Sequence, residues 1–286
     1  MRTDQFHLEI VPIKNILIHE EFDPSRSDDL VKKFKKNNTL IDPIIVASLG
    51  DNKYLQLDGM NRMHCFKTLG IKTILCQIVD YNNQEVVKLS SWVHLFQAKR
   101  EEFSRYVQKN KSLKIQPAEP DDIGPRYIKE KDFGRLVTVI DKSDGAFLIS
   151  TGGSFINKVK RLNNIVSFYQ NNITREILPF DLTRRNIRLF FCENPHLLNF
   201  YENPKTNLMV IFPNFTPQQV IEVVRAGGLF PTGVTRHLIS GRCLGINIPL
   251  SYFDNSRSLS VQNQQLDIFL SKKKVRAYEE SIINFE

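Results

Sequence analysis

The chain has 286 residues, of which 41% are hydrophobic and 24% charged, and it carries a formal net charge of +8 at pH 7. These are the proportions of an ordinary soluble globular protein, and the length allows one large domain or two modest ones. The longest apolar runs fall far short of the roughly 20 residues that cross a bilayer, and the first residues lack a secretory signal. We therefore expect a cytoplasmic protein with no membrane span.

The basic charge does not by itself predict a nucleic-acid ligand, and the cysteines do not predict a zinc site or a disulfide scaffold. The charge is compatible with a nucleic-acid or phosphorylated ligand and equally with plain solubility. Its densest cluster, KKFKK at 32–36, has the spacing of a helix, so we interpret it as a solvated helix face. The absence of a CxxC pair argues against a zinc site or a disulfide scaffold. We expect four small, mostly buried hydrophobic side chains: Cys65, Cys76, Cys192 and Cys243.

The first elements predict strands around one capped helix. An alternating stretch from Leu8, with a proline at 12, indicates a strand, a turn and a second extended piece ending near His19. Ser27 is placed to cap a helix whose last turn is rich in lysine. PIIVAS, a GDN turn and KYLQLD then predict a β-hairpin, which puts Asp58 at the end of a strand.

The next segments complete a compact domain. Residues 60–69 have helical spacing, and Gly70 is well placed to end that helix. KTILCQIVD follows as a strand, and QEVVKLSSWVHLF at 84–96 is interpreted as a second substantial helix. We expect residues 1–90 to form an α+β domain of mixed sheet and short helices.

The rest of the chain is assigned to one C-terminal α/β domain, residues 91–286. We predict a loop over 117–125, an amphipathic helix over 154–169, and strands in IRLFF and NLMVIF. Thr216, Pro217 and Gln219 provide an N-cap, a first-turn proline and a capping-box partner for another helix. Short strands among turns follow, and a final helix begins near Leu259.

The segment DGMNR at 58–62 has the chemistry of an anion site. A helix that begins after a glycine at a strand end presents unpaired N–H groups and the positive end of its dipole. Arg62 can donate two hydrogen bonds to one phosphate, and Asn61 can donate one from its side-chain amide. Gly59 has no Cβ, so the backbone can approach the ligand closely. Asp58 would repel a phosphate unless Mg²⁺ lies between them or the acid accepts a proton. On its own, the pattern equally fits a helix-capping acid and a surface arginine.

Two further segments carry polar side chains of the same kind. HEEFDPSR at 19–26 places Glu20 in a turn after a strand, although acids there are also ordinary helix caps. GVTRHLISGR at 233–242 concentrates groups that can hold a carboxylate or a phosphate. These are Thr235, Arg236, His237 and Arg242. The alternative for the arginines is ordinary surface pairing with acids.

Taken together, these segments resemble the ParB and sulfiredoxin-like fold and, within it, the free L-serine kinases, including the SbnI type of siderophore loci. The resemblance lies in VPIKNILIHEEFDP, in LDGMNR followed by LGIKTILCQIV, in SSWVH, and in FPTGVTRHLISGRCLGINIPL. It covers both ends of the chain but not residues 100–205. A ParB partition protein would share only the first part and continue into a helix-turn-helix. The late segment therefore favours the kinase branch.

The resemblance implies that a phosphoryl group passes from ATP or ADP, with Mg²⁺, to the hydroxyl of free L-serine, giving O-phospho-L-serine. Glu20 corresponds to the acid that helps to deprotonate the hydroxyl, and Asp58 to an acid near Mg²⁺ that could itself be the base. The expected nucleotide-phosphate group is Gly59, Met60, Asn61 and Arg62. The expected substrate group is Trp92, Thr235, Arg236, His237 and Arg242. The family commonly has histidine where this chain has Asn61, so any titrating role there is lost.

The resemblance also implies a C-terminal region packed on the ParB-like domain, and a role in siderophore or cysteine-related biosynthesis. The competing interpretation is a nucleotide-dependent DNA-binding regulator, which the ParB-like opening and the positive charge would suit. A sulfiredoxin-like repair activity would need a cysteine beside the phosphate motif. Cys65 lies beyond it on the following helix, so we rank this activity last.

Overall fold

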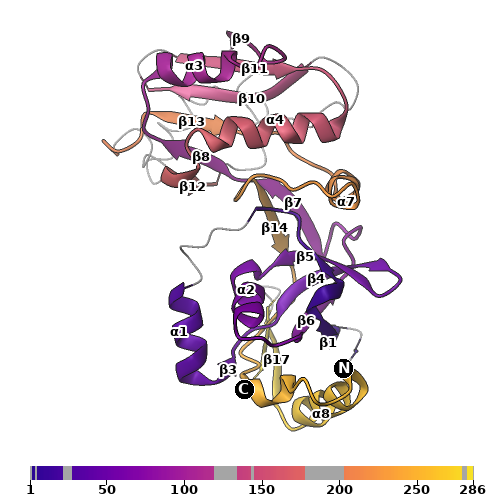
Figure 1. Cartoon of the computed structure of the whole chain (residues 1–286). Helices are drawn as coiled ribbons and strands as arrows, with labels where there is room; N and C mark the ends of the chain where they lie inside the picture. Colours follow the sequence, from indigo (N-terminus) through magenta and orange to yellow (C-terminus); the bar gives the residue numbers. More distant parts are fainter. Residues whose placement is uncertain are drawn as a thin grey trace. The chain divides into compact units, whose positions relative to one another are not determined.

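The computed structural model describes residues 2–3, 5–21, 28–118, 134–142, 145–177, 203–278 and 282–285. The chain forms two compact units (Figure 1). Unit 1 comprises Met1–Lys88 and His237–Glu286, and unit 2 comprises Leu89–Arg236. The chain passes from one to the other in β7 (Val87–Ser91) and returns in β14 (Thr235–Ile239), and these strands pair in a two-stranded sheet.

Unit 1 is built on a mixed five-stranded sheet in the order β1-β6-β4-β5-β2. The strands are β1 (Leu8–Pro12), β2 (Ile16–Leu17), β4 (Ile44–Gly50), β5 (Lys53–Asp58) and β6 (Thr73–Val79). The 3-10 turn η1 (Ile13–Asn15) lies between β1 and β2. The predicted hairpin is confirmed, because β4 and β5 are antiparallel and Asp51 and Asn52 between them have φ of 49° and 55°. Two consecutive positive φ values are typical of the tight turns that match strand twist.

Helices α1 (Asp28–Asn37) and α2 (Met60–Thr68) pack with this sheet through apolar side chains. The Phe34 and Phe66 rings lie 5.7 Å apart, and Phe66 lies 5.0 Å from Phe253. The lysines of KKFKK are exposed, which confirms the solvated helix face. Ser27, the predicted cap of α1, lies outside the described residues.

The C-terminal elements of the chain belong to unit 1, whereas we expected all residues from 91 to 286 in one domain. They are β15 (Arg242–Leu244), β16 (Ile248–Pro249), η7 (Leu250–Phe253), α8 (Leu259–Ser271), β17 (Val275–Tyr278) and β18 (Ile282–Phe285). β16 pairs with β3 (Thr39–Leu40), and β15 and β17 both pair with β18.

The C-terminal elements belong to unit 1 because β1 is an edge strand of its sheet and α8 covers that edge. Asn263 of α8 accepts a hydrogen bond from Ile10 N at 2.8 Å and donates one to Ile10 O at 2.9 Å. Its side-chain amide thus satisfies backbone groups that an edge strand leaves unpaired. Leu266 and Leu270 of the same helix lie in the core that contains β1. Such long-range pairing cannot be seen in a local pattern.

Unit 2 contains a six-stranded sheet in the order β12-β8-β13-β10-β11-β9, and every pair in it is antiparallel. Its strands are β8 (Val93–Phe96), β9 (Lys114–Pro117), β10 (Gly134–Asp141), β11 (Gly145–Thr151), β12 (Thr174–Glu176) and β13 (Leu208–Ile211). Its helices are α3 (Arg100–Gln108), α4 (Phe155–Ser167), η4 (Gln170–Asn172) and α7 (Pro217–Arg225). Phe96 of the sheet contacts both Phe103 of α3 and Phe168 at the end of α4, so both helices cover one face.

The predicted helix over residues 84–96 is wrong, because this segment forms β7 and β8. All four residues of β8 are buried, and the strand pairs with β12 on one side and β13 on the other. A strand buried on both faces reads as a near-continuous apolar run, which periodicity alone cannot distinguish from a buried helix. Pairing with strands more than 75 residues away decided the outcome.

The other helix predictions are confirmed. Ser154 caps α4, and Thr216 and Gln219 form the complete capping box of α7. The predicted strand at 187–191 and most of the predicted loop at 117–125 lie outside the described residues. Overall the α+β class is confirmed. Within the described ranges, no helix is both long and apolar enough to cross a membrane.

Candidate functional site

The junction between β5 and α2 has the predicted geometry. Asp58 ends β5, and Gly59 precedes the helix with φ 94° and ψ 26°. The first helical bond runs from Met63 N to Gly59 O at 3.0 Å. The N–H groups of residues 60–62 therefore have no acceptor within the helix, as in any first turn. This end of α2 can receive an anion.

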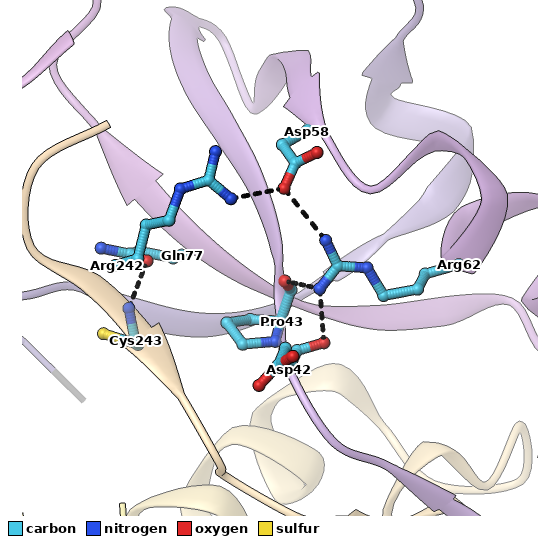
Figure 2. A network of polar contacts seen from close by, with 7 residues as sticks. All are labelled: Asp42, Pro43, Asp58, Arg62, Gln77, Arg242 and Cys243. Atoms are coloured by element: carbon cyan, nitrogen blue, oxygen red, sulfur yellow. Dashed lines mark hydrogen bonds and ion pairs between the residues drawn. The ribbon is translucent and has the colours of Figure 1, made fainter. Parts of the chain in front are cut away.

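Two arginines that are far apart in the sequence, Arg62 and Arg242, meet at Asp58 (Figure 2). Arg62 Nη2 lies 3.1 Å from Asp58 Oδ2, and Arg242 Nη1 lies 2.8 Å from the same oxygen. Arg62 Nη1 also donates to Asp42 O at 3.1 Å and to Pro43 O at 2.7 Å. Arg242, from the end of the 233–242 segment, thus meets the 58–62 segment within unit 1.

The arginines set the protonation state of Asp58. Burial alone would raise its pKa, but the charges of Arg62 and Arg242 outweigh burial and hold the pKa below its ordinary value. Hydrogen bonds from Arg242 and from the Gly59 backbone act in the same direction. A carboxylate held in its ionised form is a good cation ligand and a poor proton acceptor.

Arg242 is held in place through its backbone. Gln77 Nε2 donates to Gly241 O at 2.8 Å. Gln77 Oε1 accepts from Cys243 N at 2.9 Å (Figure 2). One side-chain amide therefore pairs with the residues on both sides of Arg242. Asp42 Oδ1 accepts a third bond from Gly245 N at 2.8 Å. These contacts fix the position of the backbone from which the Arg242 side chain extends.

Glu20 lies beside a cluster of aromatic rings in the same unit. His19 Nε2 is 3.9 Å from Glu20 Oε1, and the His19 ring stands edge-on to His237 at 5.1 Å. His237 Nε2 lies 2.8 Å from the Tyr81 hydroxyl. Burial lowers the pKa values of both histidines, so both are neutral near pH 7.

The remaining predicted substrate residues lie in unit 2. The Arg236 guanidinium lies over the Trp92 ring at 5.1 Å, and Trp92 N donates to Val234 O at 3.0 Å. Thr235 is buried, and Trp92 is the half-buried residue between β7 and β8. His94 of β8, two residues after Trp92, contacts Gly233 O through Nε2 at 2.8 Å. Burial lowers the pKa of His94 to about 3, so the ring stays neutral.

The structure thus places the predicted residues in two groups. Unit 1 holds Glu20, the 58–62 segment, His237 and Arg242, whereas unit 2 holds Trp92, Thr235 and Arg236. Sequence reasoning missed the residues that hold the first group in place: His19, Asp42, Gln77 and Tyr81. Gln77 did carry a signal, since it is a polar residue inside the apolar strand TILCQIV and is 3% exposed. A buried polar side chain needs partners.

Changing Gly59 to alanine is expected to destabilise the protein. The residue has a positive φ, and an added Cβ would lie 2.6 Å from Ile44 Cγ2, so strain and overlap together should cost about 2–3 kcal/mol. Gly70→Ala is the matched control, because Gly70 has φ 72° and no atom within 4 Å of the added Cβ. Urea denaturation should show a smaller loss there, of about 1 kcal/mol. Equal losses would contradict the overlap at Gly59.

The stability difference between the wild type and Asp58→Asn is expected to depend on pH. The folded pKa of Asp58 lies below its ordinary value of 3.8, so ionisation stabilises the folded chain fully above that value. The contribution is lost as the pH falls through the folded pKa. The difference in Tm, wild type minus variant, should therefore be largest near pH 7 and shrink below about pH 4. A difference that stays constant to pH 2 would contradict the lowered pKa.

Comparison with known proteins supports both the fold and the predicted resemblance. Residues 4–91 match the ParB N-terminal domain family. The ATP-dependent L-serine kinase of Staphylothermus marinus is 26% identical over 238 residues, which cover 82% of this chain and 86% of that protein. The ATP-dependent L-serine kinase SbnI of Staphylococcus aureus is 22% identical over 288 residues, which cover 96% of each.

Two solved structures share the fold over most of the chain. SbnI with a C-terminal truncation, from Staphylococcus aureus, gives a TM-score of 0.67 at 19% identity and covers 93% of this chain and 96% of its own. A free serine kinase in complex with AMP gives 0.66 at 17% identity, covering 89% and 96%. At these identities the structural match shows the fold alone. This chain therefore has the fold of the free serine kinases with a ParB-type N-terminal part, and the resemblance predicted from its motifs is confirmed.

Proposed function

We propose that this protein is a free L-serine kinase that transfers a phosphoryl group from ATP, or from ADP, to the serine hydroxyl. The product is O-phospho-L-serine. The observation that carries the proposal is the convergence of Arg62 and Arg242 on Asp58 at the start of α2. It is supported by relatives named ATP-dependent L-serine kinases, which align over most of the chain.

The nucleotide phosphates bind at the first turn of α2. Backbone N–H groups of residues 60–62 and the Asn61 amide supply the donors, and Gly59 keeps the approach open. Arg62 already donates to three oxygens of unit 1, so it positions Asp58 and the 42–43 backbone as well as adding positive charge. Arg242 adds the second charge over the transferring group.

Glu20 is the base that accepts the serine proton. A serine hydroxyl does not ionise near neutrality, so a carboxylate must take its proton as the new P–O bond forms. Asp58 is a weaker candidate because its two arginines hold its pKa down. Glu20 Oε1 lies 3.9 Å from Nε2 of the His19 ring, and the Glu20 side chain is 16% exposed. The two acids therefore have separate roles.

Asp58 also fits a Mg²⁺ ion. Among the described residues no group of three or more His, Cys, Asp or Glu side chains could form a metal cage. Mg²⁺ at a phosphoryl-transfer site needs only one or two carboxylates together with substrate phosphates and water. Both arginines contact Oδ2 of Asp58, and a carboxylate has about four acceptor positions. The ion would neutralise charge on the transferring phosphates.

Trp92, Thr235 and Arg236 form the serine pocket. Arg236 is the cation for the substrate carboxylate, and the Trp92 ring beneath it fixes the direction of the guanidinium. His94 and the Trp92 backbone hold residues 233–234, which lead directly into Thr235. The product would serve siderophore or cysteine-related biosynthesis.

The test is direct. Purified protein is incubated with L-serine, Mg²⁺ and either ATP or ADP, and O-phosphoserine is sought by mass spectrometry. L-Alanine in place of L-serine is the matched control, since it lacks only the hydroxyl. Omitting Mg²⁺ tests the metal. The proposal fails if neither nucleotide gives phosphoserine.

The two competing functions receive less support. An antiparallel sheet, rather than a helix-turn-helix DNA reader, follows the ParB-like segment in the described residues of unit 2. For sulfiredoxin-like chemistry, Cys65 is buried, and burial raises the pKa of its thiol. A protonated, buried thiol is a poor nucleophile. Cys76 and Cys243 are buried in the same way, and Cys192 lies outside the described residues.

A further inference from the structure

His237 has both ring nitrogens engaged inside unit 1. Its Nε2 lies 2.8 Å from the hydroxyl of Tyr81, a residue that is 3% exposed. The imidazole also makes a hydrogen bond to the backbone of Leu57 that raises its pKa. In a hydrogen bond that raises the pKa of a histidine in this way, a ring N–H of the histidine donates to the backbone carbonyl oxygen. Since Nε2 is paired with Tyr81, the donor to Leu57 is Nδ1.

These two bonds select one tautomer. With the proton on Nδ1, Nε2 carries the lone pair and must accept from the Tyr81 hydroxyl. Burial raises the pKa of Tyr81, so the hydroxyl keeps its proton as a donor. Burial, His19 and Arg242 lower the pKa of His237, so the ring remains neutral. In this arrangement no ring N–H of His237 remains for the substrate, although we placed His237 in the expected substrate group.

The ring contacts the neighbour of each proposed acid. Leu57, which accepts the Nδ1 bond, immediately precedes Asp58 in β5. His19, which stands edge-on to His237 at 5.1 Å, immediately precedes Glu20 and lies 3.9 Å from its carboxylate. His237 thus connects the strand end that carries one acid to the turn that carries the other.

We propose that Tyr81 is a positioning residue for phosphoryl transfer. Its hydroxyl fixes the orientation and tautomer of His237, and His237 holds Asp58 and Glu20 at the separation the reaction needs. This inference rests on the proposed kinase function. Because misplacement by about 1 Å can reduce turnover by about a hundredfold, a single supporting hydroxyl is enough to matter.

Tyr81→Phe tests the inference, because it removes only the hydroxyl. We expect kcat for phosphoserine formation to fall about tenfold, the upper range of the effect of one net hydrogen bond, while the nucleotide Kd stays within about twofold. Tyr106→Phe is the matched control: the Tyr106 hydroxyl bonds Asn164 O at 3.1 Å and Ser167 Oγ at 2.9 Å in unit 2. It should leave kcat unchanged. Thermal denaturation checks that both variants fold.

Two further measurements separate positioning from general structural support. His237→Asn keeps a donor for Leu57 and loses the bond to Tyr81, so adding Tyr81→Phe to it should cause no further loss of kcat. Long-range proton–nitrogen NMR of the wild type should show His237 protonated on Nδ1. Additive losses in the double variant, wild-type kcat in Tyr81→Phe, or an Nε2-protonated ring would each overturn the inference.

The outcomes for the two proposals are distinguishable. A wild type that makes no phosphoserine overturns the kinase function and, with it, any role of Tyr81 in turnover. The NMR measurement needs no activity, so it still decides whether Tyr81 and Leu57 select the tautomer of His237. An active wild type with an unaffected Tyr81→Phe variant overturns only the role of Tyr81.

Discussion

Replacing Glu20 by glutamine is expected to lower kcat for phosphoserine formation by about 10²–10⁴-fold, the usual contribution of a general base. Glutamine keeps the size and one oxygen of the side chain but cannot accept the serine proton. The nucleotide Kd, measured by calorimetry, should change little, because the phosphates bind at the start of α2. The loss should therefore appear in kcat and kcat/KM alike.

The neighbouring acid provides the control. Glu21 is exposed and follows Glu20 directly, so Glu21→Gln removes a charge of the same sign at almost the same place. It should retain activity within about twofold, since surface changes away from the reaction have small effects. If Glu20→Gln were fully active, Glu20 would have no part in the mechanism. Equal losses in both variants would point to general electrostatics instead.

Asp58→Asn is expected to lower kcat at least about a hundredfold, which is typical for loss of one preorganised charged group. The asparagine retains an acceptor oxygen but leaves two guanidinium groups without a counter-charge. It also weakens any hold on Mg²⁺, so the Mg²⁺ concentration that gives half-maximal rate should rise. Steady-state rates over a series of Mg²⁺ concentrations measure both effects.

Asp254→Asn is the matched control for Asp58→Asn. Asp254 also faces an arginine, with Oδ2 3.6 Å from Arg257 Nε, but its side chain is 42% exposed and belongs to no part of the proposed site. It should change neither kcat nor the Mg²⁺ dependence. An Asp58→Asn variant with a large loss of kcat but an unchanged Mg²⁺ dependence would exclude Asp58 as a metal ligand and leave it as the group that orients the two arginines.

The local elements of this protein could be predicted where the residues of one short segment are enough to determine its conformation. The capping box of α7 needs only Thr216 and Gln219, three residues apart. The β4–β5 hairpin needs only its tight turn, and the junction at Gly59 needs only a glycine between a strand and a helix. In each case the backbone conformation depends on neighbours within about one turn.

The same reasoning failed where distant pairing decides the structure. Residues 84–96 are apolar enough for a buried helix, and only their pairing with β12, β13 and β14 makes them strands. The division of the chain was missed for the same reason, because α8 completes an edge of a sheet that began more than 250 residues earlier. Long-range pairing has no local signature.

For the candidate site, the sequence by itself determined which groups are present: two acids, a helix start and the arginines of the 58–62 and 233–242 segments. Only the tertiary structure decided how they are used. It showed that Arg62 and Arg242 share one carboxylate oxygen, that Gln77 holds Arg242, and that both nitrogens of His237 are taken. Residue types set the available chemistry, whereas protonation and orientation depend on partners that only folding brings within hydrogen-bond distance.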